Sequence, residues 1–148
     1  MSDRIRLTHF GLCVRDIGRA EQFYCNALGF EAIGRMTVDD DATATLLDIP
    51  GLLLELVYLQ RDGFRLELLG YARPATVGEQ GPRPMNAVGF THLSFRVDDA
   101  DRVMDAIVAH GGRTLPERTV AFSGGNRGLM ATDPEGNLLE LIERTADR

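Results

Sequence analysis

Two histidines and two glutamates occupy matching places in the two halves of the chain, and together they could bind a metal ion. His9 and His92 each follow a threonine and are 83 positions apart. Glu67 and Glu140 each stand between two leucines and are 73 positions apart. Imidazole nitrogens and carboxylate oxygens are ligands that divalent cations bind in proteins. Each half therefore offers one histidine and one glutamate to a predicted metal site.

These four residues lie inside longer repeated segments. Residues 8–16 resemble residues 91–99, and residues 63–68 resemble residues 136–141. Identical residues at the same two offsets include Thr8/Thr91, Val14/Val97, Asp16/Asp99, Arg19/Arg102, Gly29/Gly112, Gly63/Gly136 and Leu66/Leu139. Between the two segments the first half is ten residues longer than the second. Such self-similarity predicts a module of about 60 residues used twice.

Both halves show the same order of predicted elements, strand–helix–strand–strand–strand. In the first half we expect strands at 5–14, 30–38, 52–60 and 64–71, with a helix at 17–27. In the second half we expect strands at 90–97, 113–120, 127–132 and 137–143, with a helix at 99–110. The prediction is an α+β fold of two tandem βαβββ modules, at about 4–71 and 88–144, joined by a linker at 72–87. We expect one domain spanning residues 1–148.

Alternation along the strands places the four residues on one side of each sheet. His92 alternates with the apolar Leu93, and the glutamates alternate with flanking leucines. The apolar face must be the one that the helix covers, so the histidines and glutamates face away from it. A glutamate inside a sheet concavity is costly unless it is paired or bound to metal. Each residue taken alone could be merely structural or exposed, but the recurrence in both halves favours a shared metal site.

Three further residues are candidates for substrate binding. Arg96 shares the face of His92 and could pair with an anionic group of a substrate, or else balance Glu67 or Glu140. Arg127 follows a glycine-rich loop, residues 123–126, that could act as a lid with this arginine as an anion clamp. Tyr71 is expected at the mouth of the cavity.

Composition excludes several classes of function. The net charge is −6 and no basic stripe occurs, which argues against nucleic acid as a partner. All 16 basic residues are arginine, so lysine Schiff-base chemistry is excluded. No apolar run approaches the roughly 20 residues that span a bilayer. We therefore expect a cytoplasmic protein that acts on a small molecule, with no membrane partner.

At these residues the chain resembles the vicinal oxygen chelate superfamily, the glyoxalase/bleomycin-resistance/extradiol-dioxygenase fold. The matching motifs are Thr8-His9, residues 20–24 with 28–30, residues 66–68, residues 91–93 and residues 133–141. The resemblance implies two paired βαβββ modules that form an incomplete curved barrel around a metal site. It also implies that His9, Glu67, His92 and Glu140 are the metal ligands.

The quartet resembles the metal shell of bacterial-type glyoxalase I. The resemblance implies a metal-dependent isomerase or lyase that removes a proton next to a carbonyl, with Zn, Ni, Co, Mn or Fe stabilising the enediolate. Glu67 or Glu140 would be the general base. Three alternatives stay open: an epimerase similar to methylmalonyl-CoA epimerase, an extradiol-type Fe(II) dioxygenase using His9, His92 and Glu140, and a non-catalytic protein that binds a small molecule or confers resistance.

The ten extra residues of the first half fall within residues 39–51. Residues 42–47 can form one or two helical turns, with Leu46, Leu47 and Ile49 as an apolar edge. This edge could cap the first sheet, or it could wall the cavity or meet a second subunit. We expect a homodimer, because pairing of modules between chains is an option for a duplicated architecture.

Overall fold

The computed structural model describes residues 5–79 and 81–144, and these form two compact units. The first unit comprises residues up to 21 together with 29–77, and the second comprises 22–28 together with the residues from 78 onward. The boundary therefore passes through the first helix. No described helix is long and apolar enough to cross a membrane.

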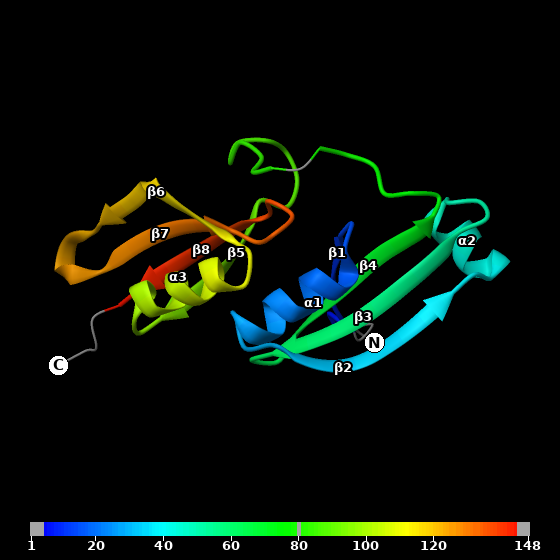
Figure 1. The fold of residues 1–148 in the computed structure, drawn as a ribbon, viewed down its shortest axis with the longest axis horizontal. Coiled ribbons are helices and arrows are strands. Elements are labelled where there is room, and N and C mark those ends of the chain that lie inside the picture. Colours follow the sequence, from blue (N-terminus) through cyan, green and yellow to red (C-terminus); the bar gives the residue numbers. More distant parts are fainter. Residues whose placement is uncertain (1–4, 80, 145–148) are drawn as a thin grey trace. The chain divides into compact units, whose positions relative to one another are not determined.

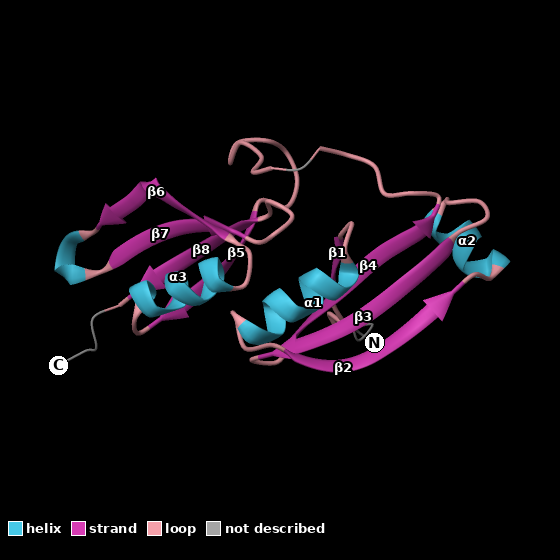
Figure 2. Ribbon diagram, in the orientation of Figure 1, coloured by secondary structure: helices cyan, strands magenta, loops and turns pink. Residues whose placement is uncertain are grey.

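The first unit is a four-stranded mixed sheet with a helix after its first strand (Figures 1 and 2). Its elements are β1 (Phe10–Cys13), α1 (Ile17–Asn26), β2 (Glu31–Val38), α2 (Asp41–Leu47), β3 (Leu53–Arg61) and β4 (Phe64–Arg73). The strand order is β1-β4-β3-β2, in which β1 is parallel to β4 and the other neighbours are antiparallel. The first and last strands in sequence are thus neighbours in the sheet.

The second unit repeats this topology. Its elements are β5 (His92–Val97), α3 (Ala100–Ala109), β6 (Arg113–Ala121), a short 3-10 turn (Ser123–Gly125), β7 (Arg127–Thr132) and β8 (Leu138–Glu143). The strand order is β5-β8-β7-β6, again with one parallel pair between the first and last strands. The predicted α+β fold of two tandem modules is therefore confirmed, and neither described sheet closes on itself.

The leucines that flank the glutamates are buried on the opposite side of each sheet, while in the first sheet Leu54 and Leu56 are buried on the face of Glu67 itself. Leu66 and Leu68 flank Glu67 and are almost fully buried, and Leu139 and Leu141 flank Glu140 with no exposed surface. In the first unit the first turn of α1 packs closely on β4. A Cβ atom at Gly70 would lie 3.0 Å from Cβ of Ile17, so only glycine leaves ordinary room for the helix there.

Strand β1 is shorter than predicted. The sequence favours a strand over residues 5–14, but the structure forms one only from Phe10 to Cys13. Ile5 and Leu7 are 93% and 72% exposed. The reason is the parallel register, which pairs Phe10 with Leu66. Strand β4 begins only two residues before Leu66, so the residues ahead of position 8 have no backbone beside them to pair with.

The extra residues of the first half form helix α2, which confirms the helical turns predicted at residues 42–47. Asp40 is its N-cap, and its carboxylate accepts a hydrogen bond from the Thr43 backbone N–H at 2.8 Å. This bond lowers the pKa of Asp40. Ala44 and Ile49 pack with a buried cluster of leucines at 52, 54 and 56. Leu46, by contrast, is 82% exposed.

A buried polar network holds the turn between β7 and β8. The Tyr24 hydroxyl donates to Oδ2 of Asp133 at 2.8 Å, and Oδ1 of Asp133 accepts from the backbone N–H groups of Glu135 and Asn137. Burial and the neighbouring carboxylate raise the pKa of Tyr24. Asp133 is 2% exposed, and these bonds offset the cost of burying it. We assign this network a structural role.

Candidate metal centre

The first pair of predicted ligands meets on the open side of the first sheet. The parallel register sets Gly11 of β1 opposite Glu67 of β4, which brings His9, just before β1, beside that glutamate. Nε2 of His9 lies 3.1 Å from Oε2 of Glu67. On the other side of the ring, Nδ1 lies 3.0 Å from the Thr8 hydroxyl. We call His9 and Glu67 the first half-site.

The second pair repeats this arrangement in the second sheet. Nε2 of His92 lies 3.7 Å from Oε1 of Glu140, and Nδ1 of His92 lies 2.8 Å from the Thr91 hydroxyl. Ser94 stands directly opposite Glu140 in the β5–β8 pair, and its hydroxyl donates to Oε1 of the glutamate at 2.7 Å. We call His92 and Glu140 the second half-site.

Both half-sites have the donor atoms and spacing that a divalent cation needs. Two ligands each about 2.1 Å from a shared tetrahedral ion lie roughly 3.4 Å apart, between the 3.1 Å and 3.7 Å separations of the two pairs. When Nδ1 donates its proton to the threonine hydroxyl, Nε2 keeps a lone pair for a metal. Histidine nitrogen with carboxylate oxygen suits Zn, Ni, Co, Mn or Fe.

Each half-site by itself supplies only two ligands. Among the residues that the structure describes, no three His, Cys, Asp or Glu side chains form a group that could hold a metal ion. A shell of four ligands would need one pair from each kind of module. The assignment of His9, Glu67, His92 and Glu140 as ligands of one ion therefore stays a prediction.

Tyr58 is a neighbour of the first half-site that the sequence reading missed. It lies directly opposite Glu67 in the β3–β4 hairpin. Hydrogen bonding to the Glu67 side chain is the largest cause that raises the pKa of Tyr58. Its ring also meets the His9 ring edge-on, with centroids 5.9 Å apart. The signal available in the sequence was the Asp62-Gly63 turn, which sets the hairpin register.

Tyr71 lies on the same face of β4 as Glu67, as predicted from strand alternation. It is half-buried and packs against the apolar cluster formed by the leucines at 52, 54 and 56. Burial raises its pKa, and the neighbouring Cys13 and Glu67 add to the shift. The first half-site is therefore bordered along its strand by apolar and aromatic surface.

Arg96 lies on the half-site face of β5. It follows Ser94 by two residues and is paired with Ile142, which in turn follows Glu140 by two. Its side chain is exposed, and it forms no ion pair with another residue in the described part of the chain. A role for Arg96 in binding an anionic group stays a prediction.

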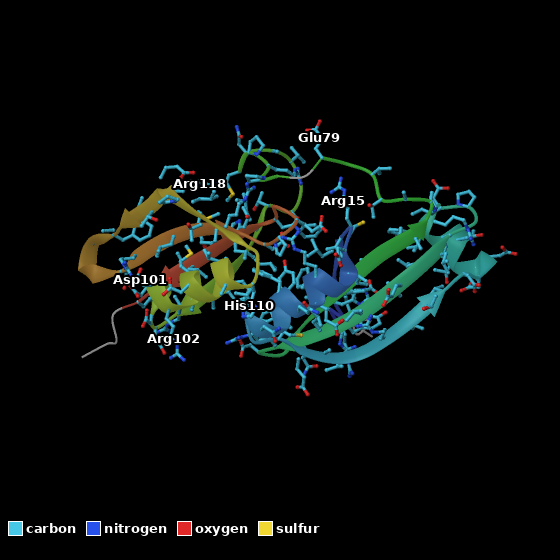
Figure 3. All side chains as sticks on the ribbon, viewed as in Figure 1. Arg15, Glu79, Asp101, Arg102, His110 and Arg118 are labelled. Atoms are coloured by element: carbon cyan, nitrogen blue, oxygen red, sulfur yellow. The ribbon has the colours of Figure 1, made fainter. Side chains whose placement is uncertain are left out.

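Arg127 lies on the opposite face, so the structure does not bring it to the other predicted site residues. Register pairs it with Glu143, and its Nε lies 2.5 Å from Oε2 of that glutamate. A second bond reaches Asp101 on α3 at 3.1 Å; Figure 3 labels Asp101 on this helix. These two carboxylates raise the pKa of Arg127. The arginine ties β7 and β8 to the first turn of α3, and we leave it out of the proposed substrate contacts.

Comparison with known proteins identifies the family to which the chain belongs. The family model for the Glyoxalase/Bleomycin resistance protein/Dioxygenase superfamily matches residues 6–141. A curated protein from Brassica oleracea var. gemmifera, named "Putative lactoylglutathione lyase", is 25% identical over 142 residues. That alignment covers 96% of this chain and 45% of the relative, so the chain spans about half the length of the curated protein it matches.

Solved structures share the fold. A glyoxalase family protein from Bacillus cereus has a TM-score of 0.85 at 22% identity, over 96% of this chain and 95% of that one. A fosfomycin resistance protein from Listeria monocytogenes, crystallised with Mn(II) and a sulfate ion, has a TM-score of 0.59 at 19% identity, over 95% of this chain and 93% of that one. With the match of the family model over most of its length, the chain belongs to the glyoxalase/bleomycin resistance protein/dioxygenase superfamily.

Proposed function

We propose that the protein is a divalent-metal-dependent isomerase or lyase of the glyoxalase I type, acting at a C–H bond next to a carbonyl. The observation that carries the proposal is the repeated half-site, in which a histidine Nε2 faces a glutamate oxygen and Nδ1 faces a threonine hydroxyl. The superfamily includes enzymes, and the Brassica relative carries the name of a lactoylglutathione lyase. The Listeria protein with the same fold holds Mn(II).

His9 and Glu67 would supply two ligands and His92 and Glu140 the other two. A module of each kind contributes one pair, whether from one chain or from two chains of a homodimer. The threonine hydroxyls orient the imidazole rings, which is what outer hydrogen-bond partners do for metal-binding histidines. A bound divalent ion would polarise the substrate oxygens and so make the neighbouring C–H bond more acidic.

We assign the general base to Glu140 and a purely ligating role to Glu67. The side chain of Glu140 is 31% exposed and that of Glu67 is 12% exposed, so the second carboxylate is more accessible to a substrate carbon. A carboxylate that takes the proton can return it to the adjacent carbon or to the opposite face of the same carbon. The first outcome is isomerisation and the second is epimerisation.

The remaining side chains on these faces suggest which part of the substrate each would meet. Arg96 would pair with a carboxylate or phosphate of the substrate, because its guanidinium is exposed and offers a fork of donors. Tyr71 and the apolar cluster beside it would contact an uncharged portion. The substrate class that follows is a small carbonyl compound with an anionic group.

Turnover of hemithioacetals and of acyl-CoA esters, each with and without EDTA, tests the proposal. We expect one class to be converted and EDTA to abolish the conversion, while added metal restores it. The matched control is His110→Ala, because His110 is the third histidine and lies at the exposed end of α3. Turnover that persists without metal would contradict the proposal. Oxygen uptake with catechols and Fe(II) would instead favour a dioxygenase.

A further inference from the structure

We propose that Tyr58 is a positioning residue of the first half-site, whose hydroxyl holds the Glu67 carboxylate in place as a metal ligand. The inference rests on the proposed metal-dependent function and adds a residue to it. Tyr58 would not bind the ion itself; it would act through Glu67.

The hairpin places the Tyr58 hydroxyl where it is needed. Asp62 and Gly63 both have positive φ, at 50° and 78°, which is the signature of a two-residue type I′ turn. This turn pairs Arg61 with Phe64 and, three residues further along each strand, Tyr58 with Glu67. Directly opposed side chains in an antiparallel pair point to the same face and lie within reach of each other.

Glu67 needs a fixed partner because it is largely withdrawn from water. Its side chain is 12% exposed, and a carboxylate in such a place costs free energy unless hydrogen-bond donors satisfy it. The directly opposed Tyr58 offers a hydroxyl donor, and hydrogen bonding to Glu67 raises the pKa of this tyrosine. The same tyrosine packs edge-on against His9, the other ligand of the half-site. One side chain therefore restrains both the carboxylate and the imidazole.

In the second half-site the glutamate accepts its hydrogen bond from the parallel neighbouring strand and not from the antiparallel one. Ser94 stands opposite Glu140 on the parallel neighbour β5 and donates to it at 2.7 Å. In the first half-site the residue in that place is Gly11, which has no hydroxyl. Conversely, the antiparallel neighbour of Glu140 is Met130, which has no donor, whereas the antiparallel neighbour of Glu67 is Tyr58.

Each glutamate therefore has one hydroxyl donor beside it, although the donor comes from opposite strands in the two halves. A hydroxyl beside each glutamate, from different strands in the two halves, is accounted for if the carboxylate must be held still. Outer hydrogen-bond partners of metal ligands typically change metal affinity by about 10- to 100-fold when they are removed. We expect a loss of that size for the Tyr58 hydroxyl.

The test is the affinity for Co(II), measured by competition with a chelator, together with the visible absorption of the bound ion. Tyr58→Phe keeps the ring against His9 and removes only the hydroxyl, so it should weaken Co(II) binding about 10-fold or more and alter the spectrum. Tyr24→Phe is the control, because the Tyr24 hydroxyl donates to Asp133 and the residue belongs to neither half-site. Its Co(II) affinity should equal that of the wild type.

A double-mutant cycle with Glu67→Ala shows whether Tyr58 acts through the glutamate. Once the carboxylate is gone, Tyr58→Phe should cause no further loss of Co(II) affinity. An equal loss in both backgrounds, or a Tyr58→Phe variant that binds Co(II) as tightly as the wild type, overturns the inference while leaving the metal site intact. A wild-type protein that takes up no Co(II) overturns both the inference and the proposed function.

Discussion

The Ser94 hydroxyl donates a 2.7 Å hydrogen bond to Oε1 of Glu140, the carboxylate that we assign as the general base. The two residues lie opposite each other on the parallel strands β5 and β8. This bond engages one carboxylate oxygen and orients the group, so that its direction toward a substrate is set by the sheet. A base held in this way needs little reorganisation before it takes a proton.

Replacing Ser94 by alanine should therefore lower kcat by roughly 10-fold with little change in melting temperature. The change removes one exposed hydrogen bond, whose net contribution to stability is only about 1 kcal/mol. Steady-state kinetics and thermal unfolding of the same preparation measure both quantities. Ser94→Thr keeps the hydroxyl and should restore most of the rate. If kcat is unchanged in Ser94→Ala, the Ser94 hydroxyl does not orient Glu140 for catalysis.

His9→Ala and His92→Ala should each lower metal content severely while leaving the fold intact. Both histidines lie away from the buried leucines at 66, 68, 139 and 141, so removing them leaves no cavity in that packing. Metal analysis and far-UV circular dichroism of the purified variants check the two halves of this prediction. His110→Ala should match the wild type in metal content. If either half-site variant keeps stoichiometric metal, that histidine is not a ligand.

The two glutamates should give different kinetic patterns. Glu140→Gln should lower kcat more than it lowers metal content, because an amide can still bind a metal through its oxygen but cannot accept the proton. In Glu67→Gln the rate should fall only as far as the metal content falls, as expected of a plain ligand. Metal content and kcat measured side by side separate these cases. Parallel losses in both variants would argue against a shell carboxylate as the base.

The pairing of a histidine with a glutamate could be predicted from sequence because both residue types recur at matching positions in the two halves. Strand alternation then assigned their faces correctly. Tyr58 was missed because its relation to Glu67 depends on pairing register, which the Asp62-Gly63 turn sets and which the apolar pattern alone does not show. In the same way, the extent of β1 depended on where β4 begins and not on the apolar character of Ile5 and Leu7.

Arg127 illustrates a limit of alternation. Strand β7 is half-buried at Arg127 and buried at its five other positions, so its burial pattern does not mark which face is the open side. Only the register, which pairs this arginine with Glu143 and Met130 with Glu140, shows that it faces α3. A strand buried on both faces gives no periodicity from which to orient its first residue.

Arg127→Gln should lower stability without raising KM. The arginine lowers the pKa of Glu143, so the ion pair stabilises the folded state above the ordinary titration range of a glutamate and loses this effect as the pH falls through the lowered pKa. The difference in melting temperature between the wild type and the variant should therefore be present at pH 7 and shrink in acid. A raised KM with an unchanged melting temperature would instead show that Arg127 contributes to substrate binding.

The exposed side of α2 should affect assembly and not folding. Leu46 is 82% exposed, so Leu46→Ala should change the free energy of unfolding by less than about 0.5 kcal/mol. Ile49 packs in the cluster with the leucines at 52, 54 and 56, and Ile49→Ala should cost at least about 1 kcal/mol. If the apolar side chain of Leu46 meets a second subunit of the expected homodimer, sedimentation will show weaker association for Leu46→Ala than for the wild type. Unchanged sedimentation, stability and KM in this variant would show that Leu46 contributes to neither the dimer nor the site.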